Sequence, residues 1–480
     1  MKVTEEYVRK MMNNNEEQQV YSLIKDHKAE MEVNQKLYNM LGIISYNQKD
    51  ISNANYFFAM SLLMNIDNID DLINSGIIRF IENELDESID FFTQAKKLSN
   101  DQQLNNQVNQ YLIEIMRKKQ NGVTYKRKIT VTFLEELLNE LINNMSNQNF
   151  NDIDLDRYNK NEANTVLNNG SINYDVAYQI AQYIEGISFL YENLGDEQSK
   201  ETLKGILSYR ILGHLRVKLN LNNSLYWSER KYIKDLKDSE EKIAVGFKGW
   251  ELEHYDLSSL GYPIKMFYLP MGIHATFVRK QYEHTEVKVE KDDYVIDAGG
   301  CYGDTALFFA EEVGPRGKVF TFEFIKSNLE IMKRNIDINP AVSSTITIVS
   351  HPLWSISGNE LFYIDNGPGS SLSEQPISRN KTTTISIDDF VVENSVAKID
   401  FIKMDIEGAE LNALKGAEKT ILKFRPKMAI SIYHKIEDFS EIHKYIDGLN
   451  CDYSFYLDHF TTFAEETILY AKPNKRPILL

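Results

Sequence analysis

The alternation of apolar and polar positions divides the chain into a helical first part and a second part in which strands alternate with helices. Helical periodicity runs through the first hundred or so residues and resumes from Ile129 to Ile142 and from Tyr174 to Leu221. After Tyr294, short apolar runs alternate with helical patterns, which predicts an α/β fold with a parallel sheet and helices on both faces. The first expected strand ends at Asp297, and further strands are expected at 318–322, 345–350, 401–404 and 428–433. The expected helices span 305–312, 327–338 and 411–423, and hairpin-like sequence follows the strand at 345–350 as far as Ile387. Residues 453–457 and 467–471 are expected to form a final antiparallel pair.

The first hundred residues also match themselves at an offset of 34 positions. Gly42 corresponds to Gly76, Phe58 to Phe92 and Ser61 to Ala95. A helix-turn-helix period of 34 residues with glycine, aromatic and small residues in this order resembles the tetratricopeptide repeat. Such repeats bind a peptide or protein partner on a concave face or mediate self-association. A second interpretation is that these are plain helical hairpins packed on the rest of the chain.

Composition and charge limit the classes of partner. The 480 residues include 53 basic and 70 acidic side chains and carry a formal charge of −17, which disfavours nucleic acid and anionic membranes. The first ten residues are charged where a signal peptide needs an apolar core, and no run of about 18 apolar residues predicts a membrane span. The two cysteines, Cys301 and Cys451, predict neither a disulfide framework nor a cysteine zinc site, and a reducing cytoplasm is expected.

The segment from Tyr294 to Thr305 has the pattern of a nucleotide-type cofactor site. An apolar strand ends in Asp297, and a turn containing Gly299, Gly300 and Gly303 leads into a helix. A dinucleotide fingerprint is excluded because the required glycines would fall on non-glycine residues. A carboxylate at the strand end suits a positively charged ligand such as S-adenosylmethionine better than a pyrophosphate. The alternative is a glycine-rich turn that binds no ligand.

The next expected strand supports the same cofactor. It ends in Glu323, 26 positions after Asp297. An acid at the end of the second strand of such a unit can accept hydrogen bonds from both ribose hydroxyls.

Three motifs together resemble the FkbM-type methyltransferases. They are Asp297–Thr305, Phe401–Glu410 and the closing Glu466–Tyr470, and the resemblance extends from about Tyr191 to the C-terminus. It implies a class I, Rossmann-like seven-stranded sheet, preceded here by an all-α helical-repeat region. It also implies S-adenosylmethionine-dependent methylation, mostly of hydroxyl groups on sugars or natural products. The expected domains are a repeat domain at 1–120, a helical lead-in at 121–240 and the methyltransferase domain at 241–480.

The resemblance also assigns candidate cofactor-binding residues. Asp297, Gly299 and Gly303 would hold the methionine part, Glu323 the ribose, and Asp405 would line the pocket at the end of the fourth strand. The segment from His351 to Trp354 lies where such folds contact adenine, although Trp354 is equally consistent with core packing. The remaining predicted cofactor contacts are Asp304, Thr305 and Phe324.

Methylation of a hydroxyl needs a general base, and histidine is the usual choice near neutral pH. His434 directly follows the strand at 428–433, at the edge where open sheets place ligands, and is the first candidate together with Asp405. A structural histidine at a strand end is an equally good interpretation of His434. His351 is a further candidate base.

Asp405, Glu407 and Glu410 place three carboxylates within six positions where a strand becomes a helix. The helix dipole favours acids at this end and explains Glu407 and Glu410 without a ligand. A divalent metal is the alternative, but no metal site is predicted. The loop from Asn366 to Leu372 either covers the acceptor or is a solvated turn.

Three functional hypotheses follow. The first is O-methylation of a hydroxyl on a sugar, glycan or related metabolite, with the repeats positioning the carrier. The second is N-methylation of an amino sugar or an amino-acid amine on a surface structure. The third is an adaptor in which only the repeats are functional, and the intact acids and glycines of the predicted site argue against it.

Overall fold

The computed structural model describes residues 2–25, 30–120, 132–147, 172–245, 249–376 and 378–474. The chain forms two compact units. The first comprises residues 1–188 and 204–218, and the second comprises residues 189–203 and 219–480. Most of the polar stretch at 118–128 and of the predicted loops at 144–173 lies outside the described residues. The division into domains at 1–120, 121–240 and 241–480 stays a prediction.

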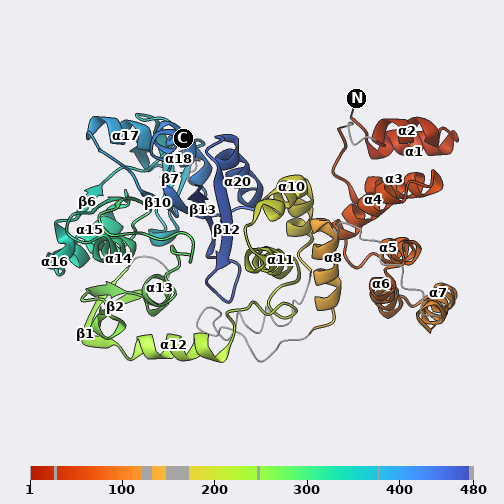
Figure 1. Ribbon diagram of the computed structural model, residues 1–480, viewed down its shortest axis with the longest axis horizontal. Helices are drawn as coiled ribbons and strands as arrows, with labels where there is room; N and C mark the ends of the chain where they lie inside the picture. The colour runs from red at the N-terminus through yellow and green to blue at the C-terminus, as the bar shows by residue number, and fades with distance from the viewer. Residues whose placement is uncertain are drawn as a thin grey trace, which may run out of the picture. The chain divides into compact units, whose positions relative to one another are not determined.

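The first unit is built from helices, as the periodicity predicts, with one isolated bridge between Val3 and Met31 among its described residues (Figure 1). Two helices, α10 and α11, cross the boundary between the units. The helices are α1 Glu5–Asn13, α2 Glu17–Ile24, α3 Gln35–Asn47, α4 Ile51–Met64, α5 Ile69–Glu82, α6 Leu85–Leu98, α7 Gln102–Gln120, α8 Phe133–Asn144, α10 Tyr174–Asn193 and α11 Glu197–Leu212.

Two helical hairpins of this unit reproduce the offset of 34 residues. Helices α3 and α5 begin at Gln35 and Ile69, and α4 and α6 begin at Ile51 and Leu85. A Cβ atom at Gly42 would lie 2.6 Å from the Phe58 ring, and one at Gly76 would lie 2.9 Å from the Phe92 ring. Each glycine thus leaves the space that an aromatic ring of the facing helix fills. Membership of the tetratricopeptide class stays a prediction.

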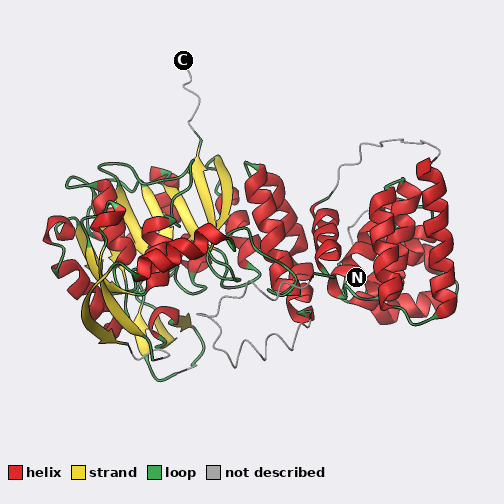
Figure 2. Ribbon diagram, turned by 90° about the horizontal axis from the view of Figure 1, so that it is seen from below, coloured by secondary structure: helices red, strands yellow, loops and turns green. Residues whose placement is uncertain are grey.

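The second unit is built on a seven-stranded mixed sheet, with helices flanking it (Figure 2). The strand order is β12-β13-β11-β10-β4-β5-β6, and β13 runs antiparallel to both of its neighbours. This confirms the predicted α/β class and the predicted antiparallel pair at the end of the chain. The strands are β4 Tyr294–Ala298, β5 Lys318–Phe322, β6 Ile346–Val349, β10 Phe401–Met404, β11 Lys427–Ser431, β12 Tyr453–His459 and β13 Thr467–Pro473.

The register of the central strands brings three polar residues into one row. Asp297 on β4 pairs with Thr321 on β5 and with Lys403 on β10. Two residues before this row, Val295 pairs with Phe401, and both are fully buried in the same apolar core. Their burial fixes the strands, so the polar side chains are held in place by packing.

Helices and two small sheets complete the second unit. The three-stranded sheets have the orders β1-β2-β3 and β8-β7-β9, and the latter matches the hairpin-like sequence before Ile387. Their strands are β1 Lys237–Ala244, β2 Glu251–Asp256, β3 Lys265–Tyr268, β7 Glu360–Ile364, β8 Ser371–Ser373 and β9 Lys381–Thr383. The helices are α12 Ser224–Lys234, α13 Pro270–Ile273, α14 Asp304–Val313, α15 Lys326–Asp337, α16 Pro340–Ser343, α17 Ile387–Glu393, α18 Glu410–Lys415, α19 Glu418–Phe424 and α20 Asp438–Gly448.

The single helix predicted at 411–423 is wrong, because the structure has two helices there, α18 and α19. Asp388 provides the physical reason. Its carboxylate accepts hydrogen bonds from the backbone N–H groups of Lys419 and Thr420, at the start of α19. In a continuous helix these N–H groups would donate to backbone oxygens of the preceding turn. Because the Asp388 side chain accepts their hydrogen bonds instead, a new helix begins here.

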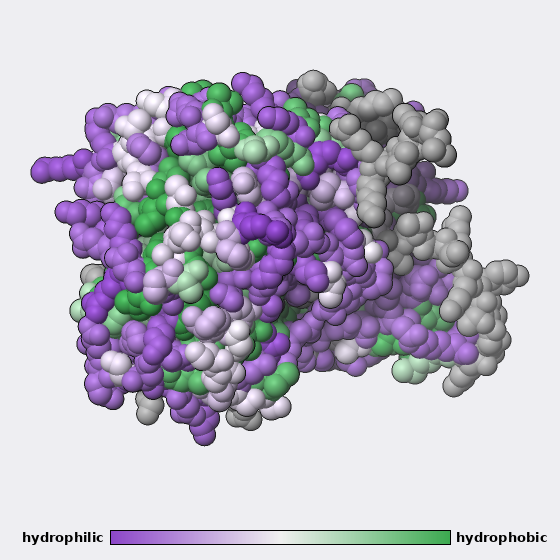
Figure 3. Space-filling model, turned by 60° about the vertical axis from the view of Figure 1, so that its left-hand side comes forward, coloured by the Kyte–Doolittle hydropathy of each residue, from purple (hydrophilic) through white to green (hydrophobic). Residues whose placement is uncertain are grey.

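Hydrophilic residues predominate on the face seen in Figure 3, with apolar residues in smaller patches among them. Among the described helices, none combines the length and the hydrophobicity needed to cross a bilayer.

Candidate functional site

The turn between β4 and α14 has the backbone geometry that the glycines predict. Gly299 has a φ angle of 85° and Gly303 one of 90°, and both values favour glycine. A Cβ atom at Gly299 would lie 1.9 Å from the backbone oxygen of Asp405. The turn therefore approaches the end of β10 so closely that only glycine fits. Cys301 also has a positive φ angle, 45°, which is unusual for a residue with a side chain.

A pocket that is partly open to solvent lies beside this turn. Its walls come mainly from the end of β5 and the segments that follow β4, β5, β6 and β10, at the carboxyl ends of parallel strands, and also from residues 367–372. Open α/β sheets bind ligands at this edge. The lining residues are Gly299, Cys301, Phe322, Glu323, Phe324, Ile325, Asn328, His351, Pro352, Leu353, Gly367, Pro368, Ser370, Leu372, Asp405, Ile406 and Glu407.

Four of the predicted cofactor-binding residues line this pocket, namely Gly299, Glu323, Phe324 and Asp405. The loop after Asn366 also contributes to the wall, through Gly367 and Ser370 among others. The predicted adenine segment lines it through His351, Pro352 and Leu353.

Trp354 does not line the pocket. It is 7% exposed and packs in an apolar cluster with Leu361 and Ala409. The structure therefore places Trp354 in the core, which is the second of the two interpretations given above. Its two predecessors, Pro352 and Leu353, form the wall instead.

Asp297 points into the interior of the unit rather than into the pocket. Its carboxylate accepts hydrogen bonds from the hydroxyl groups of Thr305 and Thr321 and lies 3.3 Å from the Lys403 ammonium. Lys403 in turn donates to the backbone oxygens of Ala298 and Gly299, at 3.1 and 2.7 Å. The side chains of Asp297 and Lys403 are 0% and 1% exposed, so this ion pair holds the end of β4 and the start of the turn together.

Two other predicted contacts lie behind the pocket wall. Asp304 is buried and accepts a hydrogen bond of 2.7 Å from the Thr276 hydroxyl. Burial raises the pKa of this carboxyl group, and the hydrogen bond from Thr276 and the charge of Lys403 oppose that shift. Gly303 faces Met332. Direct contact of the cofactor with Asp297, Gly303, Asp304 or Thr305 stays a prediction.

Glu323 is the buried acid of the pocket. Its carboxylate accepts hydrogen bonds from the backbone N–H groups of Phe324 and Ile325, both 2.7 Å, and from the Asn328 amide at 3.2 Å. Burial raises the pKa of Glu323 to about 7, although these hydrogen bonds act in the opposite direction. The carboxyl group therefore changes its charge near neutral pH.

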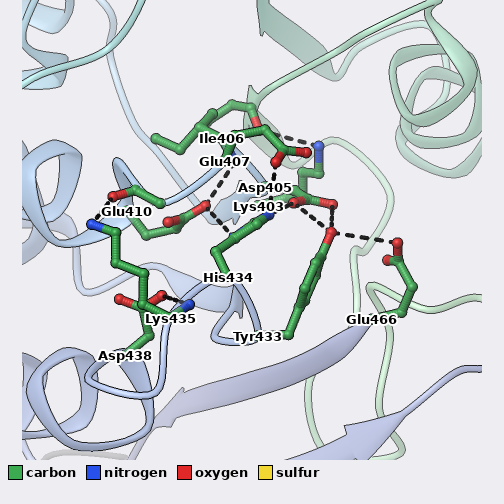
Figure 4. A network of polar contacts seen from close by, with 12 residues as sticks. Lys403, Asp405, Ile406, Glu407, Glu410, Tyr433, His434, Lys435, Asp438 and Glu466 are labelled. Atoms are coloured by element: carbon green, nitrogen blue, oxygen red, sulfur yellow. Dashed lines mark hydrogen bonds and ion pairs between the residues drawn. The ribbon is translucent and has the colours of Figure 1, made fainter. Parts of the chain in front are cut away.

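Asp405 is the centre of a polar network at the edge of the pocket (Figure 4). The hydroxyl group of Tyr282 donates to one carboxylate oxygen at 2.7 Å, and that of Tyr433 donates to the other at 3.1 Å. The Tyr433 hydroxyl also lies 3.4 Å from Glu466. Two tyrosine hydroxyl groups thus fix the orientation of the Asp405 carboxylate.

His434 lies among three carboxylates. Its Nδ1 atom is 3.2 Å from Glu410, and its Nε2 atom is 3.4 Å from Asp405 and 3.7 Å from Glu407. Burial lowers the pKa of the imidazole, but the charges of these acids raise it to about 11. At neutral pH the ring therefore carries a proton, and this geometry does not favour the predicted role of His434 as a general base.

Two acids near this network have strained backbones. Glu407 has a φ angle of 56° and Glu466 one of 71°, in the left-handed region that residues with long side chains rarely occupy. Such strain is concentrated at functional sites. Burial and the charge of Asp405 raise the pKa of Glu466 to about 8.

The sequence did not identify four residues of this site, namely Lys403, Tyr282, Tyr433 and Glu466. Lys403 and Glu466 lie inside the motifs that carry the family resemblance, so their position was visible. Their partners lie on other strands, and only the strand order reveals those contacts.

Comparison with known proteins agrees with this geometry. Residues 297–455 match the family model described as the methyltransferase FkbM domain. The chain contains an FkbM methyltransferase domain. The methyltransferase sdnD of Sordaria araneosa is 24% identical to the chain over 189 residues, in an alignment that covers 32% of this chain and 73% of the relative. Both comparisons therefore show similarity to methyltransferases over part of this chain.

Solved structures include similar proteins. The methyltransferase FkbM from Methylobacillus flagellatus KT is 21% identical with a TM-score of 0.40, and the match covers 61% of this chain and 60% of that one. The chain thus spans less than two thirds of that protein's length. Aeropyrum pernix fibrillarin, solved with bound S-adenosyl-L-methionine, is 12% identical with a TM-score of 0.29, and the match covers 48% of this chain and 93% of that one.

The matched domain contains most of the site but not all of it. Glu323, Asp405 and His434 fall inside residues 297–455, whereas Tyr282 and Glu466 fall outside. The FkbM domain of this chain therefore takes part of its polar network from flanking segments.

Proposed function

We propose that this FkbM methyltransferase transfers a methyl group from S-adenosylmethionine to a hydroxyl group of a sugar, glycan or related metabolite. The observation that carries the proposal is the pocket itself, in which Glu323 and Asp405 face the same space from the ends of β5 and β10. Glu323 is placed to accept hydrogen bonds from ribose hydroxyls, and Asp405 lies at the side where an acceptor would enter.

An unpaired atom in the pocket supports a ligand there. The Asn328 side-chain oxygen is buried and has no hydrogen-bond partner, although the amide nitrogen donates to Glu323 and to the Gly367 oxygen. A buried acceptor without a partner costs about 1–3 kcal/mol. A donor group on the cofactor, such as a ribose hydroxyl, would remove that cost.

The transfer is an in-line displacement. The acceptor oxygen forms a bond to the methyl carbon, the carbon–sulfur bond breaks, and its electron pair stays on sulfur to give S-adenosylhomocysteine. The proton of the hydroxyl group passes to a pocket carboxylate, and we propose Asp405 or Glu407 for this role because both line the pocket. Holding oxygen, carbon and sulfur in line supplies much of the rate.

The direct test is methyl transfer from radiolabelled S-adenosylmethionine to a panel of sugars and nucleotide sugars. We expect a labelled product that is stable to mild base, as an ether is, and a loss of at least tenfold in kcat for Asp405→Asn with little change in cofactor affinity. Absence of transfer to every hydroxyl acceptor, with transfer to amines, would replace this proposal by the next one.

N-methylation of an amino sugar or amino acid is the second candidate, and the charge of the site favours it. Asp405, Glu407, Glu410 and Glu466 lie around one imidazole, and Lys403 is turned toward Asp297. An excess of carboxylates suits an ammonium group. An amine loses its proton before the reaction, so His434→Ala would reduce turnover only mildly with an amine acceptor.

We also propose that the helical hairpins of the first unit bind the carrier of the acceptor or a second copy of the chain in the cytoplasm. The support is the repeated packing of Gly42 on Phe58 and of Gly76 on Phe92. Light scattering of the full chain, alone and with acceptor-bearing proteins, distinguishes self-association from partner binding. A monomer that binds no such protein would contradict this assignment.

A further inference from the structure

We propose that Asp405, Glu410 and His434 form a binding site for one divalent metal ion at the edge of the pocket. Each residue offers one ligand atom, and these three atoms lie within 4.8 Å of one another. Two carboxylate oxygens and one imidazole nitrogen are a ligand set suited to Mn²⁺, Zn²⁺ or Mg²⁺.

The fold brings the three ligands together from neighbouring elements (Figure 4). Asp405 follows β10, Glu410 is the first residue of α18, and His434 follows β11, which pairs in parallel with β10. All three therefore lie at the same edge of the sheet, on rigid elements. The Asp405 carboxylate is further fixed by the hydroxyl groups of Tyr282 and Tyr433.

Unsatisfied atoms in this cluster point to a missing partner. The Glu410 side chain is 0% exposed, and only one of its oxygens has a hydrogen bond, from the Ile406 backbone N–H at 2.8 Å. The His434 side chain is 8% exposed, and neither ring nitrogen makes a hydrogen bond of normal geometry. Buried polar atoms of this kind are normally paired, and an ion would satisfy atoms of both residues at once.

The separations between these atoms decide which ring nitrogen can bind. Metal–ligand distances of about 2.0–2.2 Å place adjacent ligand atoms roughly 3.0–3.4 Å apart. His434 Nδ1 is 3.2 Å from Glu410 Oε1, which fits an ion held by these two atoms, whereas the 3.4 Å contact of Asp405 Oδ1 is with the other nitrogen, Nε2. When the ion binds, the nitrogen that holds it releases its proton, while the other nitrogen keeps its proton and faces a carboxylate, an arrangement that commonly orients metal-bound histidines.

The role of this ion rests on the proposed function, whereas its binding does not. Asp405 lines the pocket, so an ion on Asp405 would lie beside the acceptor. A divalent cation that binds a hydroxyl oxygen lowers the pKa of that hydroxyl and helps the oxygen to attack the methyl group. It would also balance the excess of carboxylates, and His434 would then be a ligand rather than a base.

The test is titration of the chelator-treated full chain with Mn²⁺, followed by electron paramagnetic resonance of the free ion and by calorimetry. We expect one site per chain, competition by Zn²⁺ or Mg²⁺, and a loss of more than tenfold in Mn²⁺ affinity in Glu410→Gln and in His434→Ala. The matched control is Glu437→Gln, a nearby exposed carboxylate outside the three ligands, which should leave the affinity unchanged.

Binding of S-adenosylhomocysteine is measured on the same samples. Retained cofactor binding with no Mn²⁺ or Zn²⁺ site, or equal Mn²⁺ affinity in all variants, would overturn the metal proposal and leave the methyltransferase proposal standing. Loss of cofactor binding in the unmodified chain would instead contradict the proposed function. If Glu410→Gln does not fold, His434→Ala decides, because the His434 side chain is 8% exposed whereas that of Glu410 is fully buried.

Discussion

The proposed role of Glu323 predicts that cofactor binding depends on pH. In the proposed complex a ribose hydroxyl would donate to the ionised carboxylate, and burial raises the pKa of this group to about 7 in the free protein. Below that pH the ionised fraction falls, so affinity falls as pH decreases. We expect the dissociation constant for S-adenosylhomocysteine to rise by about tenfold from pH 8 to pH 6.

Calorimetric titration at several pH values checks this prediction. Glu323→Gln should bind more weakly at pH 8 and should lose the pH dependence. An unchanged pH dependence in Glu323→Gln would show that another group is responsible, and the assignment of Glu323 to the ribose would lose its support.

At the scale of single residues, Lys403 also allows a prediction about stability. Its removal leaves the Asp297 carboxylate buried with only Thr305 and Thr321 as donors. Breaking one half of a buried ion pair costs about 3–5 kcal/mol. We expect Lys403→Met to lower the free energy of unfolding in urea by this amount.

The exposed Lys415 supplies the matched control. Lys415→Met should change the free energy of unfolding by less than about 0.5 kcal/mol. The double variant Asp297→Asn, Lys403→Met should recover part of the loss, because no buried charge is then left alone. A loss in Lys403→Met no greater than in Lys415→Met would contradict the structural role of the pair.

Individual acids of the site were predictable, whereas their partners were not. Asp297, Glu323 and Asp405 follow apolar runs, and the end of a strand can be seen in the sequence. Lys403 lies 106 positions after Asp297, and the contact depends on β4 and β10 being neighbours. The pKa of His434 was beyond prediction for the same reason, since it depends on Asp405, Glu407 and Glu410, which the pairing of β10 with β11 brings beside the ring.

At the scale of elements, the turn between β4 and α14 is the most sensitive position. Gly299→Ala adds a Cβ atom that would lie 1.9 Å from the Asp405 backbone oxygen, on a backbone with positive φ. Overpacking of this kind costs about 1–3 kcal/mol, and the strained φ adds about 1 kcal/mol. We expect a lower melting temperature and at least tenfold weaker binding of S-adenosylhomocysteine.

The control is Gly448→Ala, at the last residue of α20, where an added Cβ atom has no neighbour within 4 Å. This change should be neutral or stabilise the protein by up to about 1 kcal/mol. Equal melting temperatures and equal cofactor affinities in the two variants would contradict the account of the turn.

Strands were easier to predict than helix ends. The expected strands at 318–322 and 401–404 coincide with β5 and β10, because buried parallel strands are short apolar runs. The break between α18 and α19 could not be predicted, since the side chain that caps α19 belongs to Asp388, about thirty positions earlier. The sequence also predicted no metal site, because it could not place His434 beside Glu410.

At the scale of the whole molecule, we expect the two compact units to respond separately when a ligand binds. The pocket belongs to the second unit alone. A ligand stabilises only the unit that binds it, by about 2.7 kcal/mol at a concentration one hundred times its dissociation constant. We expect scanning calorimetry to show two transitions, of which S-adenosylhomocysteine shifts only one.

Limited proteolysis with mass spectrometry assigns the shifted transition to residues of the second unit. A single transition that shifts as a whole would contradict independent unfolding of the units. The helical class of the first unit followed from its periodicity, but its boundary did not, because residues 204–218 return to it after a segment of the second unit.

The central claim is that the pocket at the carboxyl ends of β4, β5 and β10 binds S-adenosylmethionine. Calorimetric titration of the full chain with S-adenosylmethionine and S-adenosylhomocysteine, with NAD as the control ligand, tests it most directly. The account predicts one site per chain for both sulfur compounds, at least tenfold weaker binding in Glu323→Ala, and no heat with NAD. Absence of binding by both sulfur compounds, or equal binding in Glu323→Ala, would contradict it.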